Sequence, residues 1–184
     1  MKKIYLVIGI IAGITVLILI SYISIYNNAV SLQENVDEKW ANVQTAYQRR
    51  ADLVPQLVET VKGSAKNEKD ILTEVTNARA GISNAKSPED LESAGKQINT
   101  AINLAFEAYP QIRSTENFVT LQAQLEGTEN RIKRERDLYN ESVRDYNTSI
   151  RGFFNSMFLN HETFPKKSGF NAQSGAENNP SIKF

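Results

Sequence analysis

The most apolar part of the chain runs from Ile4 to Tyr26 and contains no charged residue. As an α-helix this run would be about 35 Å long, which exceeds the roughly 30 Å hydrocarbon core of a bilayer. Backbone polar groups in lipid must be paired within their own segment, so a helix is the expected conformation. The run is longer than the apolar region of a cleaved signal peptide, and no small-residue cleavage motif follows it. Residues 1–26 are therefore predicted to be an N-terminal membrane anchor, with residues 4–26 in the lipid bilayer.

The next segment carries apolar residues at steps of three, four or seven, which is the spacing of one helix face. These positions are Val36, Trp40, Val43, Tyr47, Val54, Leu57 and Val61. Because no turn signal follows Tyr26, the anchor helix is expected to continue through this segment. Pro55 lies inside it and is expected to kink the helix.

Three further segments have helical patterns. Asn67 is a candidate cap for a helix that buries Ile71, Val75 and Ile82. Ser87-Pro88-Glu89-Asp90 is a strong helix start, and Tyr109-Pro110 should end that helix. The last and longest helix should begin at Ser114 or Thr115. Its apolar residues recur every seven positions, which favours coiled-coil-like packing: Phe118, Leu125, Ile132, Tyr139, Tyr146 and Phe153.

Four helical stripes and no strand pattern predict an all-α protein. The expected architecture is an N-terminal transmembrane helix followed by an antiparallel four-helix bundle with long first and last helices. The bundle should occupy residues 27–160. Residues 161–184 are rich in Gly, Asn, Ser, Pro and Lys, and are expected to form an ordered loop or a flexible tail.

Composition excludes several classes of function. The chain has 21 basic and 21 acidic residues, so it has no electrostatic footprint for nucleic acid. It has no cysteine, which excludes disulfides, thiolate metal sites and a lipid anchor on cysteine. His161 is the single histidine, and no phosphate-binding glycine motif occurs. We therefore expect no catalytic residue, no metal site and no cofactor, and we predict that the protein is not an enzyme.

Arg50 interrupts the apolar face of the first helix. An unpaired guanidinium would be costly to bury, so Arg50 should turn outward or pair with an acid. Glu129 and Glu135 on the last helix are the candidate partners. Our hypothesis is that an Arg50–Glu pair sets the register of the helices, while a ligand contact or no specific role remain the alternatives.

The run from Gln48 to Gly63, QRRADLVPQLVETVKG, resembles the signature of the LemA family. Further matches follow in order across nearly the whole chain, including Thr128-Glu129-Asn130, Tyr139-Asn140 and the closing Pro180-Ser181-Ile182-Lys183-Phe184. The chain departs from the family pattern at Asn155, where members usually carry proline. The resemblance implies a bacterial membrane protein with one N-terminal span and a soluble four-helix bundle, and it brings no enzyme mechanism.

The sequence thus predicts a non-enzymatic scaffold or adaptor of the bacterial cell envelope that presents a helix face to another envelope protein. Family genes often neighbour genes for membrane proteases or TPM-domain proteins, which makes either a candidate partner. The predicted interaction and register motif comprises Arg49, Arg50, Asp52, Pro55, Glu59, Glu129, Asn130, Tyr139 and Asn140.

Two alternatives are a structural homo-oligomer, whose stripes continue between protomers, and a ligand-sensing bundle, which would normally carry a second span. Lys2 and Lys3 precede the apolar run and Lys39 follows it. The positive-inside rule then places the bundle of this single-pass protein on the extracytoplasmic side.

Overall fold

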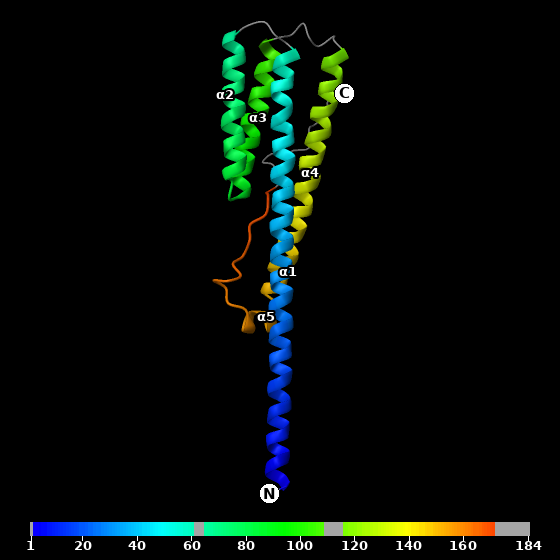
Figure 1. Cartoon of the computed structure of the whole chain (residues 1–184), viewed down its shortest axis with the longest axis vertical. Coiled ribbons are helices and arrows are strands. Elements are labelled where there is room, and N and C mark those ends of the chain that lie inside the picture. Colours follow the sequence, from blue (N-terminus) through cyan, green and yellow to red (C-terminus); the bar gives the residue numbers. More distant parts are fainter. Residues whose placement is uncertain (1, 61–64, 109–115, 172–184) are drawn as a thin grey trace, which may run out of the picture. The chain divides into compact units, whose positions relative to one another are not determined.

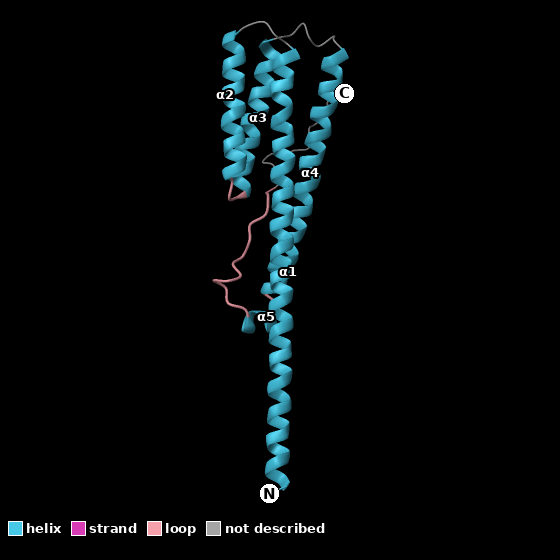
Figure 2. Ribbon diagram, viewed as in Figure 1, coloured by secondary structure: helices cyan, strands magenta, loops and turns pink. Residues whose placement is uncertain are grey.

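A computed structural model describes residues 2–60, 65–108 and 116–171 of the chain. Within these ranges every regular element is a helix and no strand occurs (Figures 1 and 2), so the predicted all-α class is confirmed. The elements are α1 (Lys2–Thr60), α2 (Ala65–Asn84), α3 (Pro88–Ala108), α4 (Glu116–Ile150) and α5 (Phe153–Phe158).

The helix boundaries correct two expectations. Helix α2 begins at Ala65, so Asn67 lies inside it and cannot be its N-cap. The short helix α5 was not predicted, because the helical pattern of the sequence decays from Gly152 onward. Helix α1 runs unbroken through Pro55. The helix start expected at Ser114 or Thr115 lies outside the described residues, and so does the helix end expected at Tyr109-Pro110.

The first part of α1 is apolar and fully exposed. Its most apolar window of 18 residues has a mean hydropathy of 2.8 and is 0% buried. By length and composition this helix can cross a membrane, as predicted for residues 4–26.

Helix contacts divide the chain into two compact units. We call residues 1–41 with 141–167 unit 1, and residues 42–140 with the segment from 168 onward unit 2. The domain boundaries expected after residues 26 and 160 stay predictions.

The core of unit 2 contains the apolar faces that the sequence predicts. Helix α2 packs along α3. Fully buried side chains from these helices and from α1 include Val43, Val54, Leu57, Ile71, Ile82, Leu91 and Ile98. Helix α4 contributes Leu125, Ile132 and Tyr139 to the buried set.

In unit 1 the seven-residue column of α4 continues to Tyr146, which is buried, but not to Phe153, which is 75% exposed. The expectation for Phe153 was wrong. Helix α4 ends at Ile150 and the chain turns at Gly152, whose N–H donates to the Ser149 carbonyl at 3.1 Å. Phe153 therefore belongs to a new helix and no longer follows the register of the old one.

The start of α3 is confirmed in detail. The Asp90 N–H donates to Ser87 Oγ at 3.2 Å, and the Asp90 carboxylate accepts the N–H groups of Lys86 and Ser87, each at 3.1 Å. This reciprocal capping satisfies backbone donors that would otherwise lack partners at a helix start. Hydrogen bonds from the backbone of Lys86 and from Ser87 hold the pKa of Asp90 below its ordinary value.

Candidate functional site

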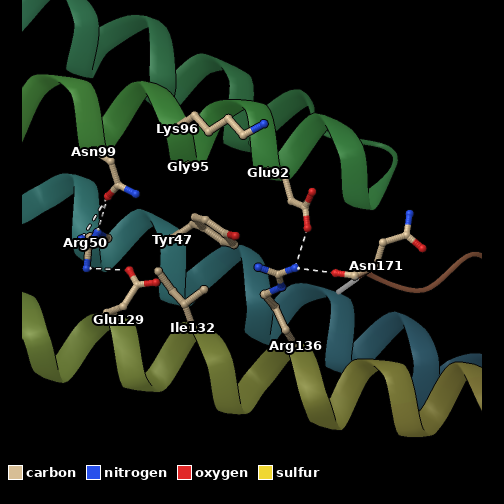
Figure 3. Close-up of a pocket in the computed structure, with 10 residues that line it drawn as sticks. All are labelled: Tyr47, Arg50, Glu92, Gly95, Lys96, Asn99, Glu129, Ile132, Arg136 and Asn171. Atoms are coloured by element: carbon tan, nitrogen blue, oxygen red, sulfur yellow. Dashed lines mark hydrogen bonds and ion pairs between the residues drawn. The ribbon is translucent and has the colours of Figure 1, made fainter. Parts of the chain in front are cut away.

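Unit 2 contains a polar pocket of about 400 Å³ between α1, α3 and α4 (Figure 3). Its lining consists of Tyr47, Arg50, Glu92, Gly95, Lys96, Asn99, Glu129, Ile132, Arg136 and Asn171. Two of these, Arg50 and Glu129, belong to the predicted interaction and register motif.

Arg50 connects three helices. Its side chain is only 12% exposed, and its Nη1 lies 2.9 Å from Glu129 Oε2 on α4. Nη1 also donates to the Leu125 carbonyl at 2.9 Å, while Nε and Nη2 donate to Asn99 Oδ1 on α3 at 3.2 and 3.0 Å. Burial lowers the pKa of Arg50, and the nearby charge of Glu129 opposes that shift.

The ion pair expected for Arg50 therefore forms with Glu129. The other candidate, Glu135, pairs with Arg131 on its own helix instead, with 3.8 Å between Glu135 Oε1 and Arg131 Nε. Glu129 is 54% exposed, so the pair joins a buried cation to a carboxylate that still contacts water. The role of this pair in setting helix register stays a hypothesis.

A second arginine–carboxylate ion pair lines the other side of the pocket. Arg136 on α4 forms an ion pair with Glu92 on α3, donates to the Asn171 carbonyl at 3.3 Å, and lies 4.6 Å from the centre of the Phe170 ring. Charge-assisted hydrogen bonds and cation–π contacts are both strengthened by partial burial. Sequence reasoning missed this pair, because both residues lie on the polar sides of their helices and nothing in either helix demands a partner.

Tyr47 lies between the two arginines in Figure 3, with its ring against Gly95 of α3. A Cβ atom at Gly95 would lie 2.5 Å from Tyr47 Cε1, so a side chain there would collide with the ring. The absence of a side chain lets α1 and α3 approach around the aromatic ring. Burial raises the pKa of the Tyr47 hydroxyl, the charge of Arg136 opposes this shift, and the charge of Glu92 adds to it.

Tyr139 and Asn140, the last two residues of the predicted motif, hold the segment that follows α5. The Tyr139 hydroxyl donates to the Ser168 carbonyl at 3.0 Å. Asn140 binds both backbone groups of Phe170, donating to its carbonyl at 3.1 Å and accepting its N–H at 2.7 Å. The chain beyond His161 is thus an ordered loop as far as Asn171, one of the two alternatives expected.

A similar set of Tyr and Asn hydrogen bonds to the loop backbone occurs within unit 1. The Tyr146 hydroxyl donates to the Pro165 carbonyl at 3.0 Å. Asn147 donates to the Lys167 carbonyl at 2.8 Å and accepts the Lys167 N–H at 3.0 Å. The sequence signal for these contacts was available as two Tyr-Asn pairs seven residues apart in one helix.

The remaining motif residues do not reach the pocket. Arg49, Asp52 and Glu59 are exposed on α1, and Pro55 is half-buried. Asp52 Oδ1 lies 2.5 Å from Arg79 Nη2 on α2. Asn130 is exposed on α4. The motif is therefore divided among a pocket, a loop-binding site and an open helix surface.

The polar groups of unit 2 mostly join one helix to another or to the loop. Each pocket arginine is paired with a carboxylate from a different helix. In the described part of the chain, no three His, Asp or Glu side chains gather as a metal site would need. The paired arginines hold the helices of this unit together.

Fold and site together define an all-helical protein with a long apolar N-terminal helix and a polar pocket between helices. Residues 39–184 match the model of the LemA family, so the chain belongs to the LemA family. It is similar to Protein LemA of Metamycoplasma hominis, with 23% identity over 137 residues, which are 72% of this chain and 63% of that protein. The chain thus spans less than two thirds of this relative's length.

Proposed function

We propose that this protein is a membrane-anchored helical bundle of the bacterial cell envelope that acts as a non-enzymatic scaffold or adaptor. The observation that carries the proposal is the pairing inside the pocket. Arg50 and Arg136 each bind a carboxylate from another helix, so their charges stabilise the helix arrangement. A rigid arrangement of this kind suits a protein that presents a surface to a partner.

The proposed architecture within unit 2 is an antiparallel four-helix bundle. Arg50 links α1 to α3 and α4, the Asp52–Arg79 pair links α1 to α2, and the Glu92–Arg136 pair links α3 to α4. The links of α1 to α2 and α4, and of α3 to α4, join helices that a bundle of this topology places side by side, while the Arg50–Asn99 bond crosses the diagonal between α1 and α3.

Anchoring by α1 is the second part of the proposal. The exposed apolar segment of α1 would have no favourable environment in water, and a bilayer supplies one. With Lys2 and Lys3 in the cytoplasm, the helices of unit 2 would lie outside the cell membrane.

The partner surface that we propose is the exposed side of α1 around Arg49 and Glu59, which are both exposed. It would bind another envelope protein, with a membrane protease or a TPM-domain protein as the candidates. Charge reversal by Arg49→Glu and Glu59→Lys should abolish recovery of the partner in pull-downs of the full-length protein from solubilised membranes. The helical circular dichroism signal should stay unchanged.

Arg134→Glu is the matched control, because Arg134 is exposed on α4 and lies outside the proposed surface. If the control lost the partner equally, or if the α1 variants unfolded, the α1 surface would not be the binding site. Light scattering of the purified protein tests the structural homo-oligomer, which a strict monomer would exclude.

A further inference from the structure

Helix α5 in unit 1 exposes three large apolar side chains to solvent. Phe153, Phe154 and Met157 are 75%, 70% and 68% exposed, and the rings of the two phenylalanines lie 5.3 Å apart. Their spacing of one and four places them on one side of a helix. A contiguous apolar surface of this kind on a soluble element usually marks an interaction site.

Aromatic contacts place this helix against a particular part of α1 (Figure 1). Phe158, on α5 itself, has its ring centre 6.3 Å from that of Tyr22. Shortly after α5, Phe164 lies edge-on to Tyr26 at 5.4 Å. Tyr22 and Tyr26 close the apolar run that begins at Ile4, so α5 lies beside the end of the candidate membrane span.

That position along α1 corresponds to a membrane–water boundary. About 20 helical residues cross the hydrocarbon core, so a span that enters at Ile4 leaves it near residue 23. Aromatic side chains are enriched at this level, and short amphipathic helices lie there with their apolar side in the boundary between headgroups and acyl chains.

We propose that α5 is an interfacial helix that inserts Phe153, Phe154 and Met157 into the surface of the bilayer that α1 crosses. The inference rests on the proposed anchoring by α1. A lipid surface fits better than a protein partner because the exposed side chains continue the apolar surface of the span through the Tyr22–Phe158 contact.

Polar contacts keep α5 in this position. Asn155 Nδ2 donates to the Ser149 carbonyl near the end of α4 at 2.7 Å. Arg151 is exposed immediately before α5, where its guanidinium can pair with a lipid phosphate.

The test uses the full-length protein in lipid nanodiscs with one nitroxide label at a time. The chain has no cysteine, so single-cysteine variants carry no background label. Phe154→Cys and Met157→Cys report on the proposed inserted side. Ser156→Cys is the matched control, because Ser156 is exposed on the same helix. Leu17→Cys reports on the span.

Collisions of each label with oxygen, which concentrates in lipid, are compared with collisions with a water-soluble nickel chelate. We expect the oxygen-to-nickel ratio at 154 and 157 to exceed that at 156 severalfold and to approach the ratio at 17. Since none of the substituted α5 residues is buried, the helical circular dichroism signal should be unchanged.

Water-like ratios at 154 and 157 with a lipid-like ratio at 17 would overturn the inference and leave the anchor intact. Exclusion of both reagents at 154 and 157 would also overturn it, because a protein surface would then cover α5. A water-like ratio at 17 would instead refute the anchoring on which the inference depends.

Discussion

Arg50→Leu removes the side chain that joins α1 to α3 and α4 in unit 2. The guanidinium donates to Asn99 and to the Leu125 carbonyl and forms an ion pair with Glu129. Leucine restores an apolar residue to the column but supplies no donor. We expect the variant to fold and to be less stable than the parent protein.

The loss of stability depends on whether each former partner of Arg50 finds another hydrogen bond. The Leu125 carbonyl keeps a bond from the Thr128 hydroxyl at 2.8 Å, and Asn99 and Glu129 are exposed enough to bind water. The two bonds to Asn99 Oδ1, counted together as one interaction, and the bond to the Leu125 carbonyl contribute about 1 kcal/mol each. With a half-exposed ion pair at up to about 1 kcal/mol, the expected loss is roughly 2–3 kcal/mol. The apolar surface that leucine buries offsets part of this loss, so we expect about 2 kcal/mol.

Urea unfolding of the full-length protein in micelles, followed by circular dichroism at the helix band, measures this quantity. For a chain of this size, about 2 kcal/mol corresponds to a drop of about 4–8 °C in Tm. Arg50→Lys keeps the charge but loses the planar fork of donors, so its loss should be smaller. In a double-mutant cycle, Arg50→Leu and Glu129→Gln should couple by no more than about 1 kcal/mol.

Unchanged stability and an unchanged oligomeric state in Arg50→Leu would refute the register hypothesis. A loss larger than about 4 kcal/mol would also contradict the reasoning, because it would mean that Glu129 is left as an unpaired buried charge.

The remaining predictions concern other contacts outside the membrane. Gly95→Ala puts a Cβ atom 2.5 Å from a buried tyrosine ring, so thermal unfolding should show a loss of about 1–3 kcal/mol. Asn140→Ala removes both bonds to the backbone of Phe170, so hydrogen exchange at that amide should accelerate while the helices persist. The pKa of Asp90 is lowered by the backbone of Lys86, so its stabilising effect is present above the ordinary value of 3.8 and is lost as pH falls below it. Asp90→Asn should therefore weaken the acid dependence in that range, as measured by unfolding at pH values above and below the ordinary value.

Matched variants separate these effects from general destabilisation. Asn147→Ala should accelerate exchange at Lys167, its partner in unit 1, and leave Phe170 protected. Gly127→Ala meets no atom within 4 Å and should not lower stability. If Gly127→Ala and Gly95→Ala cost the same, the contact of Gly95 with Tyr47 would not explain the loss.

Arg50 shows how far a pattern in one helix can predict a contact in three dimensions. A single charge in an apolar column needs a partner, and the last helix offered few acids at a compatible position, so the sequence could narrow the partner to Glu129 or Glu135. Only the structure distinguishes the two. The Glu92–Arg136 pair could not be predicted, because each residue lies on the polar side of its own helix, where a charged side chain needs no partner from another helix. That pairing depends on the mutual rotation of α3 and α4, which helical periodicity does not determine.

The end of α4 shows a second limit. The seven-residue column placed Phe153 in register with Tyr146, but Gly152 and the Asn155 bond to the Ser149 carbonyl turn the chain into α5. The composition of the C-terminal segment left its order open. As far as Asn171, hydrogen bonds from Tyr139 and Asn140 to its backbone hold an ordered loop, and such contacts depend on side chains far away in the sequence.

We propose that this LemA family member presents a helix surface to another envelope protein. Crosslinking of the full-length protein within the membranes of its native cells, followed by mass spectrometry, tests this proposal most directly. We expect reproducible crosslinks from the exposed surface of α1 around Arg49 and Glu59 to a different envelope protein, and their loss in Arg49→Glu. Crosslinks only between copies of this chain would contradict it and identify a structural homo-oligomer.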